Sequence, residues 1–479
     1  MVNGTLNFWD SGVWSFVVVL AVIFGAMLLA NTLRRKIKFI RRSLIPASVL
    51  AGFLVLGIGG AWKAVTGKPM LDTATLEALT YHGLGLGFVS LSLRTMEKTR
   101  GRQAKKDIFN TATVVVNTYL VQGIVGLTIT IVLFYIFKSF AAAGMLLPMG
   151  FGQGPGQAYA WGKNFTALGF ENGVSYGLSV AAMGFIMAGI GGVIYLRRIA
   201  KKKGIAAVEN AEQVERLTAE QITAENEIPL SESVDKLTVQ FALVFLSYGL
   251  SYLLMWTVHH FCSGIAFYDN TVCSLMWGFN FLVGTAVALC IKRVLLFLMK
   301  KGYMKRSYTN NFMLNRISGT MFDLMVTSSI AAINLEAFTH KEFVLSLVLI
   351  SVIGAAVTYF YVKKVCEKLF ADYTDEAFLS LYGMLTGTAS TGIILLREID
   401  PTFKTPASGN LVYQNLWAII FGFPMLLLMG YVGKSMTAAF VTLAALAGLL
   451  LAMSCVMFRD GLKAKIAEKK AKKPSEQEK

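Results

Sequence analysis

Apolar stretches of about twenty residues recur along this 479-residue chain, each bounded by short polar connections. The hydrocarbon core of a bilayer is about 30 Å thick, and about 20 apolar residues in a helix cross it. The pattern therefore predicts an all-α polytopic membrane protein with eleven spanning helices. The predicted spans are residues 13–33, 44–65, 75–93, 111–137, 175–196, 237–258, 271–291, 314–335, 343–362, 411–431 and 437–458.

Lys and Arg are concentrated in every second connection between the predicted spans. Short loops rich in Lys and Arg stay on the cytoplasmic side of a membrane. The alternate connections, such as 262–270, are nearly free of both residues, which predicts an external amino terminus and a cytoplasmic carboxyl terminus. The net charge of +17 follows from this topology, so it does not indicate nucleic acid as a partner. The basic connections are 34–42, 94–106, 197–203, 292–306, 363–368 and the carboxyl-terminal tail.

Two segments, 141–170 and 375–404, are apolar but too rich in Gly, Ser, Thr and Pro for ordinary spanning helices. If either crossed the membrane, the alternation of basic connections would be lost. We therefore predict two re-entrant hairpins, the first dipping in from outside and the second from the cytoplasm. Non-helical backbone is tolerated at membrane depth only inside protein or beside water, so both tips are expected to line a cavity.

A polar stretch at 208–236, rich in Glu, divides the chain into two similar halves and reads as a cytoplasmic linker. Residues 1–207 hold five spans and a hairpin, and residues 237–431 hold the same set. The first half starts outside and the second inside, which predicts inverted-topology repeats of the kind found in secondary transporters. Residues 432–458 add one further span outside the repeats, and 459–479 form a basic cytoplasmic tail.

The first hairpin carries alternating glycines, which allow tight turns and close approach to another chain or a ligand. Its free amides could hold an anion and its free carbonyls a cation, whereas a flexible surface loop is the plain alternative. A dinucleotide-binding glycine motif does not fit, because no strand precedes it and the spacing differs. The candidate substrate-binding residues here are Gly152, Gln153, Gly154, Gly156 and Gln157.

The second hairpin is rich in hydroxyl groups, which can replace water around a cation or donate to a carboxylate. A helix starting near Ser390 would direct its positive dipole end at the cavity, which suits an anionic substrate. Close helix packing by small residues is the alternative explanation. Candidate substrate contacts are Thr388, Ser390, Thr391 and Arg397, although Arg397 could equally pair with acids at the membrane surface; candidate ion ligands are Thr386 and Gly387.

Three polar residues within spans complete the predicted ion site. Asp323 is an acid near membrane depth, a placement that usually indicates function and would suit sodium or a proton. Asn117 and Asn415 are amides that could serve as ligands, although interhelical hydrogen bonding is the usual role of such residues. No catalytic constellation is recognisable and the four histidines form no metal-spaced cluster, so we predict neither an enzyme nor a cofactor. The only metal expected is a coupling sodium ion.

At its glycine stretches the chain resembles the bacterial sodium:glutamate symporter family, over most of its length to about residue 431. The family usually has His where this chain has Gln153, and an acid where it has Gly422. The resemblance implies a homodimer in the bacterial inner membrane, hairpins that meet near mid-membrane, and elevator-like movement of one domain against another. The residues that carry it are Ile45, Pro46 and Gly52, the run 85–94, Gly152, Gly154, Gly156, Ala158 and Trp161, Gly189, Gly191 and Gly192 before Arg197, and Gly383, Gly387, Thr391 and Ile393.

These observations together predict sodium-coupled symport of glutamate or a related small carboxylate. A cation held on hairpin carbonyls and hydroxyls would lower the cost of carrying a negative substrate through a low dielectric. A proton-coupled carboxylate transporter remains an alternative through Asp323. An ion channel with the hairpins as filter loops is a second alternative.

Overall fold

The computed structural model describes residues 9–95, 101–203, 235–265, 268–304, 306–400 and 404–459. These residues form helices and no β-strand. Eight helices are long and apolar enough to cross a membrane, and a bent pair, α16 with α17, would make a ninth span. The predicted linker at 208–236 and the basic tail at 459–479 lie almost entirely outside the described residues.

The long helices of the first half are α1 (Ser11–Lys36), α3 (Ala47–Thr66), α4 (Thr73–Leu93), α5 (Arg102–Phe137) and α7 (Gly173–Lys203), with the short α2 (Lys38–Arg42). Between α5 and α7 lie η1 (Ala141–Met145), η2 (Pro148–Gln153) and α6 (Pro155–Ala167). The second half begins with α9 (Lys236–Cys262), η3 (Tyr268–Val272), α10 (Cys273–Gly278), α11 (Asn280–Lys300), α12 (Asn311–Ala331), η4 (Leu335–Thr339) and α13 (Lys341–Leu369). It ends with η5 (Ala371–Tyr373), α14 (Thr374–Thr386), α15 (Ala389–Arg397), α16 (Ala407–Tyr413), α17 (Asn415–Val432) and α18 (Met436–Met457).

Nine of the eleven predicted spans each coincide with one described helix, and the spans predicted at 271–291 and 411–431 are each divided between two helices. Several helices run further than their apolar stretch. α5 begins nine residues before the predicted start at 111, and α11 ends nine residues after the predicted end at 291. The added turns carry Lys and Arg and lie beyond the hydrocarbon. The apolar pattern alone therefore cannot show that these turns are helical. The span predicted at 271–291 is also interrupted, since α10 and α11 are separated at Phe279.

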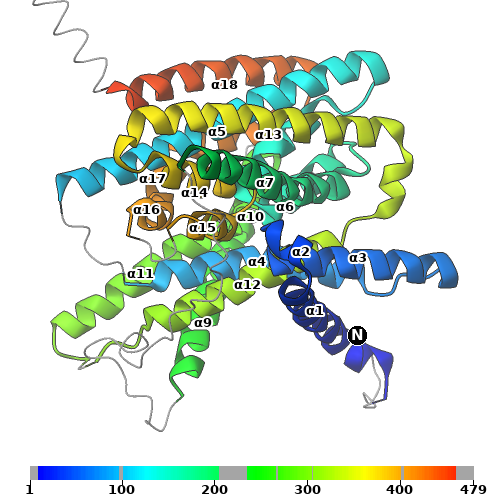
Figure 1. The fold of residues 1–479 in the computed structure, drawn as a ribbon. Coiled ribbons are helices and arrows are strands. Elements are labelled where there is room, and N and C mark those ends of the chain that lie inside the picture. The colour runs from blue at the N-terminus through cyan, green and yellow to red at the C-terminus, as the bar shows by residue number, and fades with distance from the viewer. Residues whose placement is uncertain are drawn as a thin grey trace, which may run out of the picture.

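The helices form two groups (Figure 1). In the first, which we call the α4–α12 group, α4 packs along α12 and α11, α3 packs along α12 and α1, and α9 packs on α11. In the second, the α5–α13 group, α5 packs against α13, α17 and α18, and α7 packs against α13 and α14. The groups meet through α6, α7 and α10, which contact helices of both.

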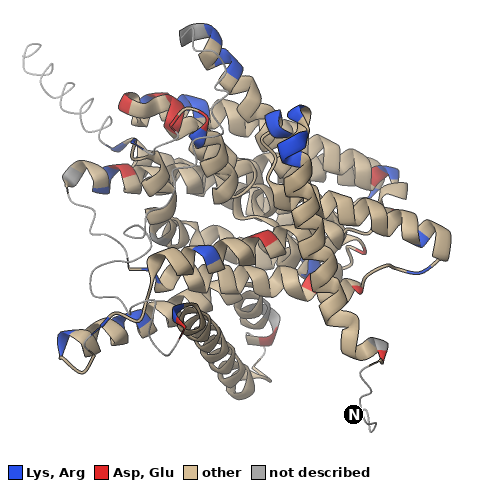
Figure 2. Cartoon of the chain, turned by 60° about the horizontal axis from the view of Figure 1, so that its bottom comes forward, with Lys and Arg blue, Asp and Glu red and all other residues tan. Residues whose placement is uncertain are grey.

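Burial differs strongly between helices. Within the apolar stretches, 67% of α7 and 50% each of α5 and α13 is buried, against 17% to 22% for the other five candidate spans. α5, α7 and α13 therefore form the interior of the molecule, and the others present apolar side chains outward, as expected in lipid. Most of the described Lys and Arg residues lie at helix ends and in connections (Figure 2).

Candidate functional site

The first predicted hairpin is a helix interrupted by a break at Gly154. η2 ends at Gln153, and Gly154 has a φ of 89°, in the left-handed region that favours glycine. Pro155 then starts α6, where its fixed φ suits the first helical position and its missing N–H costs nothing. The sequence Gly-Pro thus ends one helix and begins the next, and it leaves backbone groups of η2 without helical partners.

The second predicted hairpin has the same form. α14 ends at Thr386, Gly387 and Thr388 are non-helical, and α15 follows from Ala389. The two arms lie very close together, since a Cβ added to Gly383 would be 2.7 Å from the Cα of Gly392. The Thr388 side chain makes no capping hydrogen bond, so amide groups in the first turn of α15 have no side-chain partner from the cap residue.

The base of the second segment is fixed by a buried polar network. The Tyr373 hydroxyl donates to Oδ2 of Asp107 at 2.9 Å, and Asn410 donates to the same hydroxyl oxygen at 3.0 Å. Gln103 donates to the other carboxylate oxygen of Asp107 at 2.8 Å. Because Gln103 and Asp107 belong to α5 and Asn410 to α16, the network ties the entry of α14 to both helices.

The two breaks face each other in the interior of the α5–α13 group. A Cβ added to Gly154 would lie 3.6 Å from Cγ2 of Thr388, and η2 packs against α14. Gln153 and Thr388 are half-buried, and Ser390 is exposed. The structure therefore brings the ends of the two segments together, with hydroxyl groups accessible beside them.

Most of the predicted substrate and ion residues of the two segments gather at this meeting point. The members are Gly152, Gln153, Gly154 and Gly156 from the first segment and Thr386, Gly387, Thr388, Ser390 and Thr391 from the second. Gly156 also marks the contact with the α4–α12 group, because an added Cβ would lie 2.8 Å from the Leu84 side chain of α4. The site thus lies where the second group borders the first.

Gln157 is directed toward α10. Its side chain is 1% exposed and donates to the Gly278 carbonyl at 3.3 Å. Its Oε1 is buried without a hydrogen-bond partner, and so is Nε1 of Trp161 one turn later. The Trp161 ring packs against Phe279 at the interruption between α10 and α11, with centroids 5.5 Å apart. One face of α6 therefore places two unsatisfied polar groups against a second helix break.

Four other predicted site residues lie elsewhere. Arg397 is the last residue of α15 and is exposed. Asn117 is fully buried against α18, with its Nδ2 3.6 Å from the Met457 sulfur and its Oδ1 3.5 Å from the Ser454 hydroxyl. Asn415 begins α17 and accepts a hydrogen bond from Gln414 at 2.7 Å. Asp323 lies on α12, one turn before Thr327, whose hydroxyl donates to the Ser48 carbonyl of α3.

Two residues of α5 each contact one of the two segments. Sequence reasoning identified neither of them as part of the site. The Tyr119 hydroxyl donates to the Gly152 carbonyl at 3.0 Å. The Gln122 amide donates to the Leu385 carbonyl at 2.8 Å and to the Thr358 hydroxyl at 3.0 Å. The only signal in the sequence is an amide in an apolar span, which general interhelical hydrogen bonding already explains.

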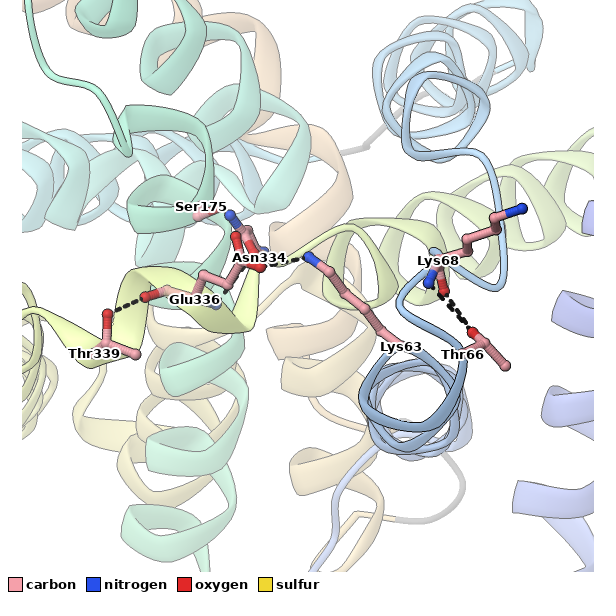
Figure 3. A network of polar contacts seen from close by, with 7 residues as sticks. All are labelled: Lys63, Thr66, Lys68, Ser175, Asn334, Glu336 and Thr339. Atoms are coloured by element: carbon pink, nitrogen blue, oxygen red, sulfur yellow. Dashed lines mark hydrogen bonds and ion pairs between the residues drawn. The ribbon is translucent and has the colours of Figure 1, made fainter.

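Polar contacts link α3 and α4 of the α4–α12 group to elements outside that group. The Tyr159 hydroxyl of α6 donates to Oε2 of Glu77 on α4 at 2.9 Å, and the Lys163 ammonium lies 3.1 Å from the same hydroxyl oxygen. Lys63 of α3 pairs with Glu336 of η4 at 2.7 Å (Figure 3).

Glu336 belongs to a small network around the turn between α12 and α13 (Figure 3). The Asn334 backbone N–H donates to the Ser175 hydroxyl at 3.1 Å, so this turn is also tied to the start of α7. The hydrogen bond and the positive charge of Lys63 lower the pKa of Glu336. The carboxylate therefore stays ionised at neutral pH, and the turn is held from two sides.

Within the described part of the chain, no group of three or more His, Cys, Asp or Glu side chains could hold a metal ion. Carbonyl and hydroxyl oxygens are the groups available at the meeting point, and such hard ligands suit an alkali or alkaline-earth cation. The meeting point is therefore the candidate site for small solutes in this part of the chain.

The described helices define the class as a multi-pass, all-α membrane protein. The sequence model of the sodium/glutamate symporter family matches residues 14–278, which is more than half of the chain. The chain therefore belongs to the sodium/glutamate symporter family. The match covers the first segment and its break and ends at Gly278 of α10. No curated protein matches the chain.

Proposed function

We propose that this protein is a secondary active transporter that carries glutamate or a related small carboxylate together with sodium. The observation that carries the proposal is the meeting of two helix breaks, Gly154 and Thr388, inside a membrane-protein core. Backbone amides and carbonyls at such breaks have no helical partner and can be satisfied by dissolved ligands. Membership of the sodium/glutamate symporter family supports the same substrate and coupling ion.

In this proposal the substrate carboxylate binds at the amino-terminal end of α15. Amide groups of its first turn and the Ser390 and Thr391 hydroxyls would donate to the anion, and the helix dipole favours negative charge there. Gly152, Gln153, Gly154, Gly156 and Gln157 would contact the substrate from the first segment. Arg397, at the far end of α15, would contribute charge rather than direct contact.

Sodium is proposed to bind at the end of α14. The Thr386 and Gly387 carbonyls and the hydroxyls near them supply oxygen ligands of the type that hard cations prefer. Coupling would follow because a bound cation lowers the electrostatic cost of placing the anion beside it. Asn117, Asp323 and Asn415 stay predictions as ion ligands, since they belong to other parts of the fold.

Two inverted repeats are proposed, 1–207 and 237–431, joined by the linker at 208–236 and followed by α18 outside the repeats. Packing of the spanning helices supports this, because exchanging a spanning helix for its counterpart in the other half reproduces several neighbouring pairs. α1 packs on α3 as α9 packs on α11, and α3 packs on α12 as α11 packs on α4. α5 packs on α17 as α7 packs on α13.

The same repeats place the first segment as a hairpin entering from outside and the second as a hairpin entering from the cytoplasm. The amino terminus would be outside and the carboxyl terminus inside, in a bacterial inner membrane. Basic residues in the last turn of α1, namely Arg34, Arg35 and Lys36, support a cytoplasmic position for that helix end.

Transport is proposed to be elevator-like, with the α5–α13 group moving against the α4–α12 group. The contact between the groups supports this, because it is confined to a few helices and includes partly exposed ion pairs. Water screens such pairs, so separating them costs little.

A homodimer is proposed from the exposed face of α12. Arg316, Thr320 and Asp323 are exposed on this helix, and polar groups at membrane depth are costly unless protein or water covers them. A second copy would cover this face, and native mass spectrometry from nanodiscs would measure the stoichiometry.

The test is uptake by purified protein in proteoliposomes. An inward sodium gradient should drive accumulation of radiolabelled glutamate, aspartate or a dicarboxylate, and replacing sodium with potassium should abolish it. Thr391→Val should weaken uptake, whereas Thr442→Val should not, because Thr442 is an equally buried threonine of α18. Accumulation driven by a pH gradient without sodium would favour proton coupling, and large single-channel currents would favour a channel.

A further inference from the structure

One helix, α5, donates a hydrogen bond to each of the two facing segments. The acceptors are the Gly152 carbonyl, two residues before the break at Gly154, and the Leu385 carbonyl, two residues before Gly387. The donors, Tyr119 and Gln122, are three residues apart and therefore lie on the same face of α5. The two segments are thus fixed at equivalent positions by neighbouring side chains.

The contact with the first segment combines packing and hydrogen bonding. A Cβ added to Gly152 would overlap the Tyr119 ring, so the backbone packs directly against this ring. Gly152 is the penultimate residue of η2, and carbonyls at a helix end have no partner within the helix. The Tyr119 hydroxyl satisfies this carbonyl at 3.0 Å.

The contact with the second segment is buried more deeply. The Gln122 side chain is 1% exposed and donates to the Leu385 carbonyl, which is among the last four of α14 and lacks a helical partner. The same amide donates to the Thr358 hydroxyl of α13 at 3.0 Å, which fixes its orientation. Losing it would leave a buried carbonyl unsatisfied.

Direct contact between the segments is weaker. Only a Cβ added to Gly154 would reach van der Waals contact with the Thr388 side chain, and among the described residues no hydrogen bond joins 148–156 to 383–392. The spacing of the two breaks is therefore set by the α5 hydrogen bonds, together with packing of both segments on α7, rather than by bonds between the tips.

We propose that Tyr119 and Gln122 are positioning residues that hold the two breaks at a fixed separation, so that both tips move with α5 as one body. This rests on the proposed transport function, because a fixed separation matters only if both tips contact the transported solutes. Neither tip opens independently as a gate in this arrangement.

The experiment compares two variants with matched controls. Tyr119→Phe and Gln122→Met each remove one donor to a tip. Tyr176→Phe removes a hydroxyl that bonds Ser346 at 2.6 Å in the same core, away from both breaks. Gln240→Met removes an equally buried amide that donates to the Tyr308 carbonyl at 2.7 Å, between α9 and the start of α12.

Two measurements are made on purified full-length protein. Hydrogen exchange of peptides covering 148–156 and 383–392 is followed without ligand, and uptake is measured as a function of glutamate and sodium. Tyr119→Phe should accelerate exchange in the first window and Gln122→Met in the second, by roughly threefold to tenfold, the range expected for one lost hydrogen bond. Both should raise the KM for glutamate or sodium more than they lower the maximal rate.

The controls should leave both windows and both KM values at wild-type levels, even where they lower the melting temperature equally. Wild-type exchange in Tyr119→Phe and Gln122→Met would overturn the proposal, and so would equal acceleration in the controls. The exchange measurement needs no substrate. If the wild type shows no sodium-driven uptake but exchange changes as expected, the transport assignment fails and the positioning role stands.

Discussion

The two arms of the second segment, α14 and α15, approach each other very closely at Gly392. This contact allows a specific prediction. A Cβ added to Gly392 would overlap the Ser380 carbonyl of the opposite arm. A backbone oxygen cannot rotate away as a side chain can, so the methyl group of Gly392→Ala must separate α15 from α14. The required shift is roughly 1 Å, since real Cβ contacts rarely lie below about 3 Å.

The free-energy change has two opposing parts. Overpacking a tight site costs about 1 to 3 kcal/mol, while replacing glycine by alanine within a helix gains up to about 1 kcal/mol. Gly392→Ala should therefore disfavour the conformation that brings the tips together by about 1 to 2 kcal/mol. Apparent affinity for glutamate should fall roughly fivefold to thirtyfold if that conformation binds the substrate.

Gly448→Ala is the matched control, because Gly448 lies within α18 and an added Cβ would meet nothing within 4 Å. This substitution should leave uptake unchanged and raise the melting temperature slightly. The measurements are the KM for glutamate in proteoliposomes and the thermal unfolding midpoint in detergent. Equal KM values for Gly392→Ala and Gly448→Ala would refute the reasoning about the arms.

Three further predictions concern the polar contacts of α3 and α4 and the acid in α12. Tyr159→Phe removes a hydrogen bond to the Glu77 carboxylate, worth about 1.5 to 3 kcal/mol, and should change the distribution between transporter conformations measured by spin-label distances. Lys63→Met should lower the free energy of unfolding slightly, and this effect should disappear at high salt. Acid should lower the stability of the wild type in the same way, because the pairing of Lys63 with Glu336 is lost as pH falls through the lowered pKa of the Glu336 carboxyl. If sodium binds at the end of α14, Asp323→Asn should retain sodium-driven uptake and its pH profile. Loss of uptake would instead support Asp323 as an ion ligand, and a flattened pH profile would support proton coupling.

The spans were predictable because a run of apolar residues must be buried or face lipid whatever its neighbours are. The ends of the helices were less predictable. α5 and α11 continue for nine residues beyond the predicted limits, where charged side chains are compatible with both helix and loop. The interruption at Phe279 was not predicted although Gly278 directly precedes it, because a single glycine within an apolar stretch does not by itself end a helix.

The two segment tips were predictable from backbone chemistry, since the sequence Gly154-Pro155 ends one helix and starts another. The hydrogen-bond partners that polar side chains find on other helices were not predictable from the sequence. Asn117 and Gln122 are both amides of α5, five residues apart, and sequence alone ranked Asn117 as the better candidate. The structure places Asn117 against α18 and Gln122 against the second segment. Which neighbour an amide meets depends on how helices pack, and no local pattern encodes it.

The attachment of α18 has a consequence for following this protein at work. α18 packs on α5 and α17, so the last described residues of the chain are carried by the same body as both tips. If that body travels through the bilayer, a dye or spin label placed near Arg459 travels with it and reports each crossing as a change in depth. Anchoring that end to a fixed support should, conversely, stall turnover while leaving ligand binding intact.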